Sequence, residues 1–153
     1  TTVVAKLFNL LNPDRVYFGQ KDAQQAFVLK KMVYDLNMDL EFIVLPTVRE
    51  EDGLAMSSRN KYLTPEQRAE AAVLYKSLKQ VRKLVVEGER NVEAIKQVLT
   101  GIIAEAGHAQ IEYIEIVDTR NLRSLSMVKG ECLIALAVKF GQTRLIDNII
   151  LEV

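Results

Sequence analysis

The sequence of 153 residues has little of several residue types whose abundance marks a class of protein. It contains one cysteine, Cys132, and one histidine, His108, which allow no internal disulfide and no zinc site of clustered cysteines and histidines. No apolar run reaches the length of about 18 residues that a membrane-spanning helix needs. We therefore expect a cytoplasmic protein, in a reducing compartment and without a membrane partner.

An excess of one charge is also missing, because 20 Lys and Arg residues balance 20 Asp and Glu residues. Residues 1–63 carry eight of each kind, and residues 64–153 carry twelve of each kind. Since neither part is basic, we expect no nucleic-acid partner. The hydrophobic fraction of 49% and the charged fraction of 26% are those of an ordinary globular protein with one large or two small domains.

The chain starts without a methionine and inside a pattern typical of an amphipathic helix. Apolar residues recur at helical spacing at Val4, Leu7, Phe8 and Leu11. A chain that begins within a secondary-structure element is expected to be a fragment or a processed piece of a longer protein.

The first 48 residues alternate between helix and strand patterns. The expected elements are a helix over 2–11, a strand over 15–18 that ends at Gly19, a helix over 21–37 and a strand over 40–45. The last strand is mostly apolar, so we expect it to be buried. Two strands joined by a crossover helix pair in parallel, which indicates part of a doubly wound α/β sheet.

A second pattern follows a charged turn at 49–53 and a polar loop at 56–61. Thr64-Pro65-Glu66-Gln67 predicts a capping box that opens a helix. The other expected elements are the rest of that helix to about Val86, a helix from Asn91 to near Gly107, and strands over 110–117, 131–140 and 143–153 with a hairpin at Gly141-Gln142. We therefore expect residues 1–63 to form part of a nucleotide-binding domain. Residues 64–153 are expected to form a small α+β domain of two helices and a three-stranded antiparallel sheet.

The first candidate site is the stretch from Phe18 to Gln25, where a strand ends and a helix begins. In open α/β sheets ligands bind outside the carboxyl ends of strands. Gly19 lets the backbone approach a ligand, Lys21 offers positive charge to phosphate, and Asp22 offers an acceptor to a ribose. The alternative is structural: Gly19 as a turn residue, Asp22 and Gln25 as a capping pair, and Lys21 as a solvated side chain.

The second candidate is the loop Met56-Ser57-Ser58-Arg59-Asn60, whose hydroxyls, backbone N–H groups and guanidinium suit a polyphosphate. A polar interdomain linker is the alternative. The acidic run Glu50-Glu51-Asp52 is expected to be a solvated hinge rather than a Mg²⁺ site. Cys132 is expected in the core, and His108 in a loop or helix cap.

Taken together, Phe18-Gly19-x-Lys21-Asp22-x-Gln24-Gln25 and Met56-Ser57-Ser58-Arg59-Asn60 closely resemble the pantothenate synthetase (pantoate–β-alanine ligase) family of the nucleotidyltransferase superfamily. The resemblance runs from Thr1 through the closing strands. It implies the C-terminal part of a Rossmann-like nucleotidyltransferase domain, followed by an α+β lid. The family's N-terminal half, with its His-x-Gly-His-type signature, has no counterpart here, so the isolated chain is expected to be inactive.

What the resemblance implies for activity is an ATP- and Mg²⁺-dependent ligase that joins pantoate to β-alanine through a pantoyl adenylate, acting as a homodimer. The implied catalytic residues are Lys21, Ser57, Ser58 and Arg59. Gln25 is the implied pantoate contact. The implied ATP contacts are Gly19, Gln20, Lys21, Asp22, Val48, Met56, Ser57, Ser58 and Arg59. Two alternatives stay open: a related nucleotidyltransferase with another acceptor, and a non-catalytic module that binds a partner chain or binds nucleotide weakly.

Overall fold

A computed structural model describes the whole chain, residues 1–153. It has an α/β architecture that divides into two compact units, Thr1–Thr47 and Val48–Val153. No helix is long and apolar enough to cross a membrane.

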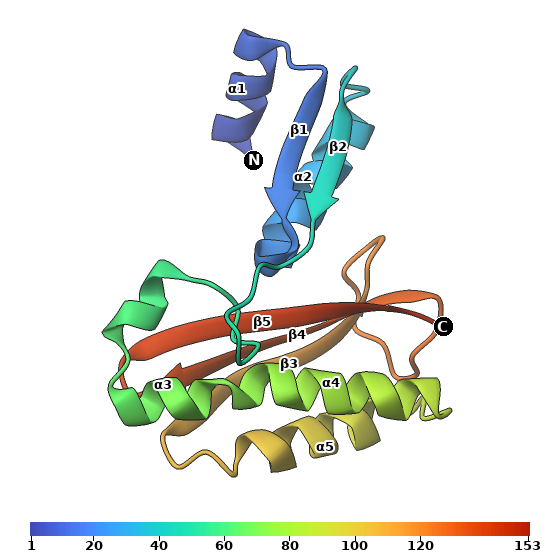
Figure 1. The fold of residues 1–153 in the computed structure, drawn as a ribbon. Helices are drawn as coiled ribbons and strands as arrows, with labels where there is room; N and C mark the ends of the chain where they lie inside the picture. Colours follow the sequence, from blue (N-terminus) through green and yellow to red (C-terminus); the bar gives the residue numbers. More distant parts are fainter. The chain divides into compact units, whose positions relative to one another are not determined.

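In the first unit, two parallel strands pair with each other and are joined by a crossover helix (Figure 1). Its elements in order are α1 (Thr2–Leu11), β1 (Arg15–Gly19), the 3₁₀ turn η1 (Gln20–Asp22), α2 (Ala23–Asp35) and β2 (Glu41–Leu45). Asn12 ends α1 in the left-handed conformation, with φ of 44°, and Pro13 follows. The register runs from Arg15 beside Glu41 to Gly19 beside Leu45, so both strands end at the same edge.

The core of this unit is small. Phe8, Val16 and Val33 form its buried cluster, and Phe18 stacks on Phe42 with ring centroids 4.9 Å apart. The expectation that the second strand is buried is wrong, because the ends of β2 are exposed and its middle is only partly covered. In a sheet of only two strands with one small buried cluster, too few side chains are present to cover both faces of an apolar strand.

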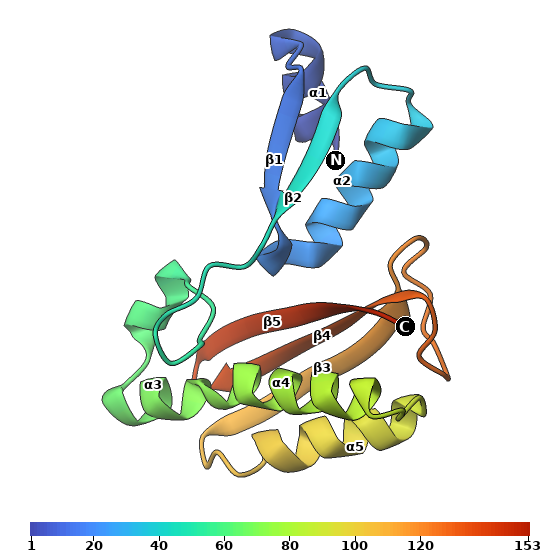
Figure 2. The same ribbon diagram turned by 45° about the vertical axis from the view of Figure 1, so that its right-hand side comes forward.

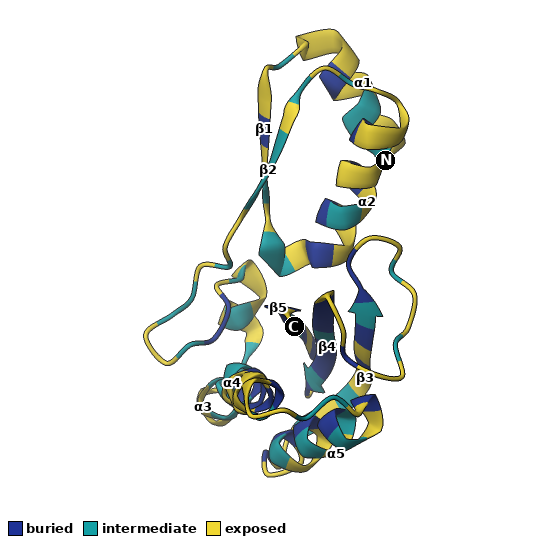
Figure 3. Cartoon of the chain, turned by 90° about the vertical axis from the view of Figure 1, so that its right-hand side faces the viewer, coloured by how far each residue is buried: buried dark blue, intermediate teal, exposed yellow.

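The second unit packs helices against one face of an antiparallel sheet (Figures 1 and 2). Its elements in order are the 3₁₀ turn η2 (Ser58–Tyr62), α3 (Pro65–Ala71), α4 (Val73–Val86), α5 (Val92–Ile103), β3 (Ala109–Asp118), β4 (Glu131–Phe140) and β5 (Thr143–Glu152). The strand order is β3-β4-β5. Figure 3 shows that β4, the central strand, is buried along most of its length.

The sequence patterns predict this unit closely. The capping box is present: Thr64 Oγ1 accepts from the N–H of Gln67, and Gln67 Oε1 accepts from the N–H of Thr64. Gly141 takes a φ of 59° in the hairpin between β4 and β5, a conformation that favours glycine. Cys132 is fully buried, as expected.

Two helix boundaries differ from the prediction. The helix expected to run unbroken to Val86 is interrupted at Ala72, whose ψ of −19° is 3₁₀-like and separates α3 from α4. The next helix ends at Ile103, before Gly107. Its last turn tightens there, because Glu105 and Ala106 donate to carbonyls three residues earlier.

The compact units divide between Thr47 and Val48, whereas the expected domains divide between residues 63 and 64. Residues 48–63 therefore pack with the antiparallel sheet. Leu54 is buried in that core, and Arg49 forms an ion pair with Asp147 on β5. The assignment of residues 1–63 to one nucleotide-binding domain stays a prediction.

Candidate functional site

The end of β1 leaves space beside its glycine. Gly19 is extended, with φ of −79° and ψ of 135°, so no turn geometry requires a glycine at this position. A Cβ atom added there would meet no atom within 4 Å, so packing within the chain does not require one either. The open space is what a ligand that approaches the backbone would need.

The polar residues after Gly19 are not used as helix caps. Asp22 stands at the N-cap of α2, but its side chain makes no capping hydrogen bond, so the alternative of an Asp22–Gln25 capping pair is wrong. Asp22 and Gln25 are exposed, and Lys21 is partly buried in the turn that joins β1 to α2. The carboxylate, the amide and the cation thus follow one strand end within two turns of chain.

The second candidate stretch is shaped by a short hairpin that sequence patterns did not reveal. The backbone N–H of Met56 donates to the carbonyl of Val48 at 2.9 Å, and Arg49 and Ala55 form an antiparallel bridge. Asp52-Gly53 lies at its tip, where Gly53 has a φ of 93°. An Asp-Gly pair is a known turn signal and was the available clue. The hairpin sets Val48 directly beside Met56.

Beyond the hairpin, the loop folds into a 3₁₀ turn rather than an irregular linker. Ser57 Oγ accepts from the N–H of Arg59 at 3.2 Å and caps η2. The Ser57 hydroxyl can still donate its own hydrogen. Met56, Ser58 and Arg59 are exposed. Two hydroxyls and a guanidinium therefore gather on one turn, an arrangement that suits phosphate oxygens.

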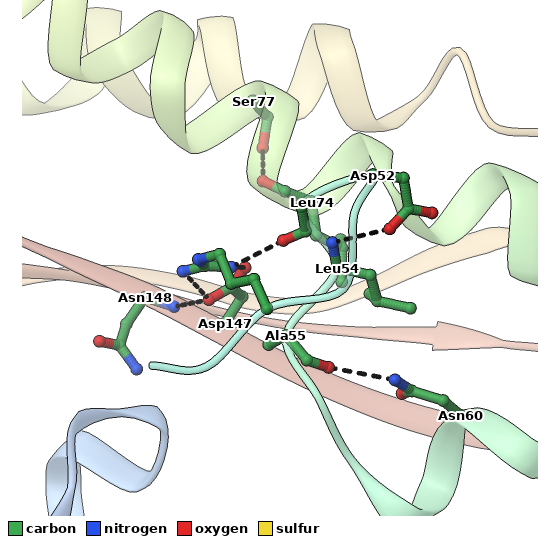
Figure 4. A network of polar contacts seen from close by, with 10 residues as sticks. Asp52, Leu54, Ala55, Asn60, Leu74, Ser77, Asp147 and Asn148 are labelled. Atoms are coloured by element: carbon green, nitrogen blue, oxygen red, sulfur yellow. Dashed lines mark hydrogen bonds and ion pairs between the residues drawn. The ribbon is translucent and has the colours of Figure 1, made fainter. Parts of the chain in front are cut away.

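Asn60, the last residue of the motif, closes the loop onto the hairpin. Its Nδ2 donates to the carbonyl of Ala55 at 3.1 Å (Figure 4). The Oδ1 atom of the same amide is buried without a hydrogen-bond partner. The side chain therefore fixes the turn through one end.

The two stretches lie in different units: Lys21 in the first, and Arg59 in the second. Their convergence on one triphosphate stays a prediction.

A group of residues that sequence patterns missed anchors the hairpin to β5. Arg49 donates to both carboxylate oxygens of Asp147, at 2.7 and 2.9 Å, and to the carbonyl of Gly53 at 3.0 Å. Its guanidinium also lies 3.8 Å from the centre of the Tyr75 ring. Figure 4 shows the Asp147 carboxylate on β5 and the loop that it holds. The partners are 98 residues apart in the chain, and no local pattern signals such a pair.

The acidic run on the hairpin is only partly a solvated hinge. Asp52 forms an ion pair with Arg68 on α3, and it accepts from the N–H of Leu54. The hydrogen bond from Arg68 is the main reason why the pKa of Asp52 lies below its ordinary value. Asp52 is thus a structural residue of the hairpin.

Two further residues behave as expected. His108 follows α5, and both its backbone N–H and its ring Nδ1 contact the Glu70 carboxylate. Burial raises the pKa of the Cys132 thiol, which suits a core residue better than a nucleophile. No group of three or more His, Cys, Asp or Glu side chains is placed to hold a metal ion.

Comparison with known proteins gives a consistent result. A family model described as pantoate-beta-alanine ligase matches residues 1–150. Pantothenate synthetases from Acetivibrio thermocellus and Syntrophomonas wolfei are 54% and 56% identical to this chain over 153 residues. The match covers 100% of this chain and 54% of each relative. The chain thus spans about half the length of these curated relatives and matches their C-terminal half.

Solved structures agree with the sequence comparison. A pantothenate synthetase from Thermus thermophilus superimposes with a TM-score of 0.89 at 42% identity, over 97% of this chain and 53% of that one. A ligase of the same kind from Francisella tularensis, complexed with beta-gamma ATP and beta-alanine, gives a TM-score of 0.62 at 30% identity. That match covers 97% of this chain and 48% of the other.

Proposed function

The chain belongs to the pantoate-beta-alanine ligase family, and we propose that it is the C-terminal part of an enzyme that joins pantoate to β-alanine at the expense of ATP. In the proposed reaction a pantoate carboxylate oxygen attacks the α-phosphorus, and pyrophosphate leaves. The β-alanine amine then attacks the acyl carbon of the pantoyl adenylate, an amide bond forms, and AMP leaves with the acyl C–O bond electrons.

The first step requires positive charge where negative charge grows on the phosphoryl oxygens. Lys21 and Arg59 are proposed to supply it, with donors from Ser57 and Ser58. The pantoate carboxylate needs no general base, because a carboxylate is already ionised at neutral pH. The protein's work is to align the reactants and to keep water from the mixed anhydride.

The other proposed contacts hold the two substrates of the first step. Asp22 would accept from the ribose hydroxyls, Gly19 and Gln20 would lie along the nucleotide, and the backbone of Val48 would contact the adenine. Gln25 would hydrogen-bond pantoate. These roles are proposed from the resemblance of the chain to the family.

The observation that carries this proposal is the hydrogen bond from Met56 to Val48. It joins the residue proposed to contact the adenine to the start of the loop proposed to contact the phosphates. One short hairpin thus presents groups for both ends of a nucleotide. A polar interdomain linker would not require this arrangement.

Mg²⁺ is proposed to accompany ATP, but the chain offers no set of side chains for it. Magnesium at ATP sites is held mainly by the phosphates themselves, so a set of protein ligands in this chain is not required. We further propose a Rossmann-like first domain, a cytoplasmic location and a homodimer, as the family resemblance implies.

The decisive experiment measures pantothenate formation by this chain alone, and by this chain with the N-terminal half of a full-length relative added as a second polypeptide. We expect no product from the chain alone and product from the mixture. Product with amines other than β-alanine would favour a related nucleotidyltransferase. A mixture that binds ATP but forms no adenylate would support the non-catalytic module instead.

A further inference from the structure

The geometry points to a pair of residues that positions the phosphate loop without touching substrate. We propose that Arg49 and Asp147 hold the hairpin 48–56, and through it the loop Met56–Arg59, in the conformation that binds ATP. This inference rests on the proposed function, since it assigns two positioning residues to the proposed ATP site. Neither residue belongs to the contacts proposed for ATP or pantoate.

The ion pair between Arg49 and Asp147 is buried and fully hydrogen-bonded. The Arg49 side chain is 16% exposed and the Asp147 side chain is 1% exposed, so the ion pair is withdrawn from water. Removal of one partner from a buried pair leaves an uncompensated charge, which is strongly destabilising. The guanidinium satisfies both carboxylate oxygens and the Gly53 carbonyl, and it stacks on Tyr75. Such a fork cannot slide along its partner as a single ammonium could.

The pair connects the hairpin to rigid elements of the second unit. Asp147 lies in β5, whose neighbour β4 is the central strand of the sheet, and Tyr75 lies on α4. Asp147 Oδ1 also accepts from the N–H of Asn148 at 2.8 Å, which fixes the carboxylate. Arg49 thus ties the hairpin to two elements of the well-packed core.

Only a few residues separate Arg49 from the loop Met56–Arg59. Arg49 is the neighbour of Val48 and the bridge partner of Ala55, and Ala55 precedes Met56. On the far side, Asn60 donates to the Ala55 carbonyl. A displacement of the guanidinium therefore moves both backbone strands of the hairpin at once. A shift of about 1 Å at reacting groups can cost about 100-fold in rate.

The test uses the substitution Arg49→Lys, which keeps the charge but loses the fork. The first measurement is hydrogen exchange of the Met56 amide in the chain itself, and it does not depend on activity. We expect exchange to be faster by about tenfold or more, as for the loss of one charge-assisted hydrogen bond, with no change in α5. Tyr75→Leu, which removes the ring beneath the guanidinium, is the second variant in case Arg49→Lys does not fold, and it should also speed exchange at Met56. Tyr75→Phe keeps the ring and should leave exchange slow.

The second measurement is steady-state kinetics in the complete enzyme. For Arg49→Lys we expect the KM for ATP to rise by about tenfold or more, while the KM for β-alanine stays within about twofold. Glu112→Gln is the matched control, because it breaks a cluster with Lys139 and Arg144 in the same sheet without touching the hairpin. A merely structural role would change stability in both variants and would leave the KM for ATP unchanged.

Failure of the positioning role and failure of the proposed function give different results. Unchanged exchange at Met56 would overturn the positioning pair, whatever the kinetics show. Faster exchange with an unchanged KM for ATP would reduce the pair to a structural link and overturn its role in ATP binding. A complete wild-type enzyme that forms no pantothenate would instead overturn the proposed function.

Discussion

The side chain of Lys21 carries the largest catalytic role proposed for a single residue of the first unit. Lys21→Ala in the complete enzyme is expected to lower the rate of adenylate formation by about 100-fold or more, as the loss of a key charge-stabilising donor does. Pyrophosphate release measures this step. Lys30→Ala, at an exposed position on α2, is the control. A near-normal rate of pyrophosphate release in Lys21→Ala would refute the role.

Gln25 has a narrower proposed role, because it is proposed to hydrogen-bond pantoate and not ATP. Gln25→Ala is expected to raise the KM for pantoate and to leave the affinity for ATP nearly unchanged. Initial rates at varied pantoate and ATP concentrations separate the two effects. An equal loss for both substrates would count against this assignment.

A third residue links the fold to pH. Hydrogen bonds from the side chain and then the backbone N–H of Arg120 lower the pKa of Asp118 from its ordinary 3.8 to about 2. Because the folded pKa is depressed, this contribution to stability is present above pH 3.8 and is lost as pH falls toward 2. Asp118→Asn is therefore expected to flatten the fall of the urea midpoint between about pH 5 and about pH 2. The same slope in both proteins would contradict the link.

At the scale of single elements, the start of α3 depends on its capping box. Thr64→Ala removes the acceptor of the Gln67 N–H and is expected to lower the free energy of unfolding by about 1 kcal/mol. Thr64→Ser keeps the hydroxyl and should recover most of the loss. Urea denaturation of the three proteins measures it. A serine variant no more stable than the alanine variant would show that the cap is not the cause.

Local chemistry explains which elements the sequence predicts well. The capping box, Asn12-Pro13 and Gly141-Gln142 each act within a few residues, so they can be recognised in the sequence. The helix start, the helix end and the hairpin turn that they mark lie where expected. The charged turn at 49–53 is predicted, but the pairing of Arg49 with Ala55 around it is not, although Asp52-Gly53 is a local hairpin signal. The contact that anchors this hairpin, between Arg49 and Asp147, joins residues far apart in the chain, so no local pattern indicates it. The predicted burial of β2 is wrong, because the sequence of an apolar strand does not show whether another element covers it.

The same distinction holds for the candidate site. The motif residues at 18–25 and 56–60 were identified from residue type and order, and the structure rules out one competing interpretation, the Asp22–Gln25 capping pair. The contacts that Arg49 makes with Asp147 and Tyr75 could not be predicted in this way, because each residue type is common and only the fold brings the three side chains together.

For the whole molecule, the two units should differ in local stability. The buried cluster of the first unit has three residues around a two-stranded sheet, whereas helices and a three-stranded sheet share a continuous core in the second. Amides of β1 and α2 are therefore expected to exchange with solvent faster than those of β4 and α5. Native-state hydrogen exchange followed by mass spectrometry measures this difference. Equal protection in both units would show that they unfold together.

The Arg49–Asp147 pair also determines where the chain can be cut. A shortened polypeptide that starts at Thr64 would keep Asp147 on β5 but would lose its cation, together with Leu54 from the core. The Asp147 carboxylate would then lie buried without its charge partner, which is costly. A shortened polypeptide that keeps the antiparallel sheet intact must therefore start at or before Val48. Any such polypeptide also contains the loop Met56–Arg59.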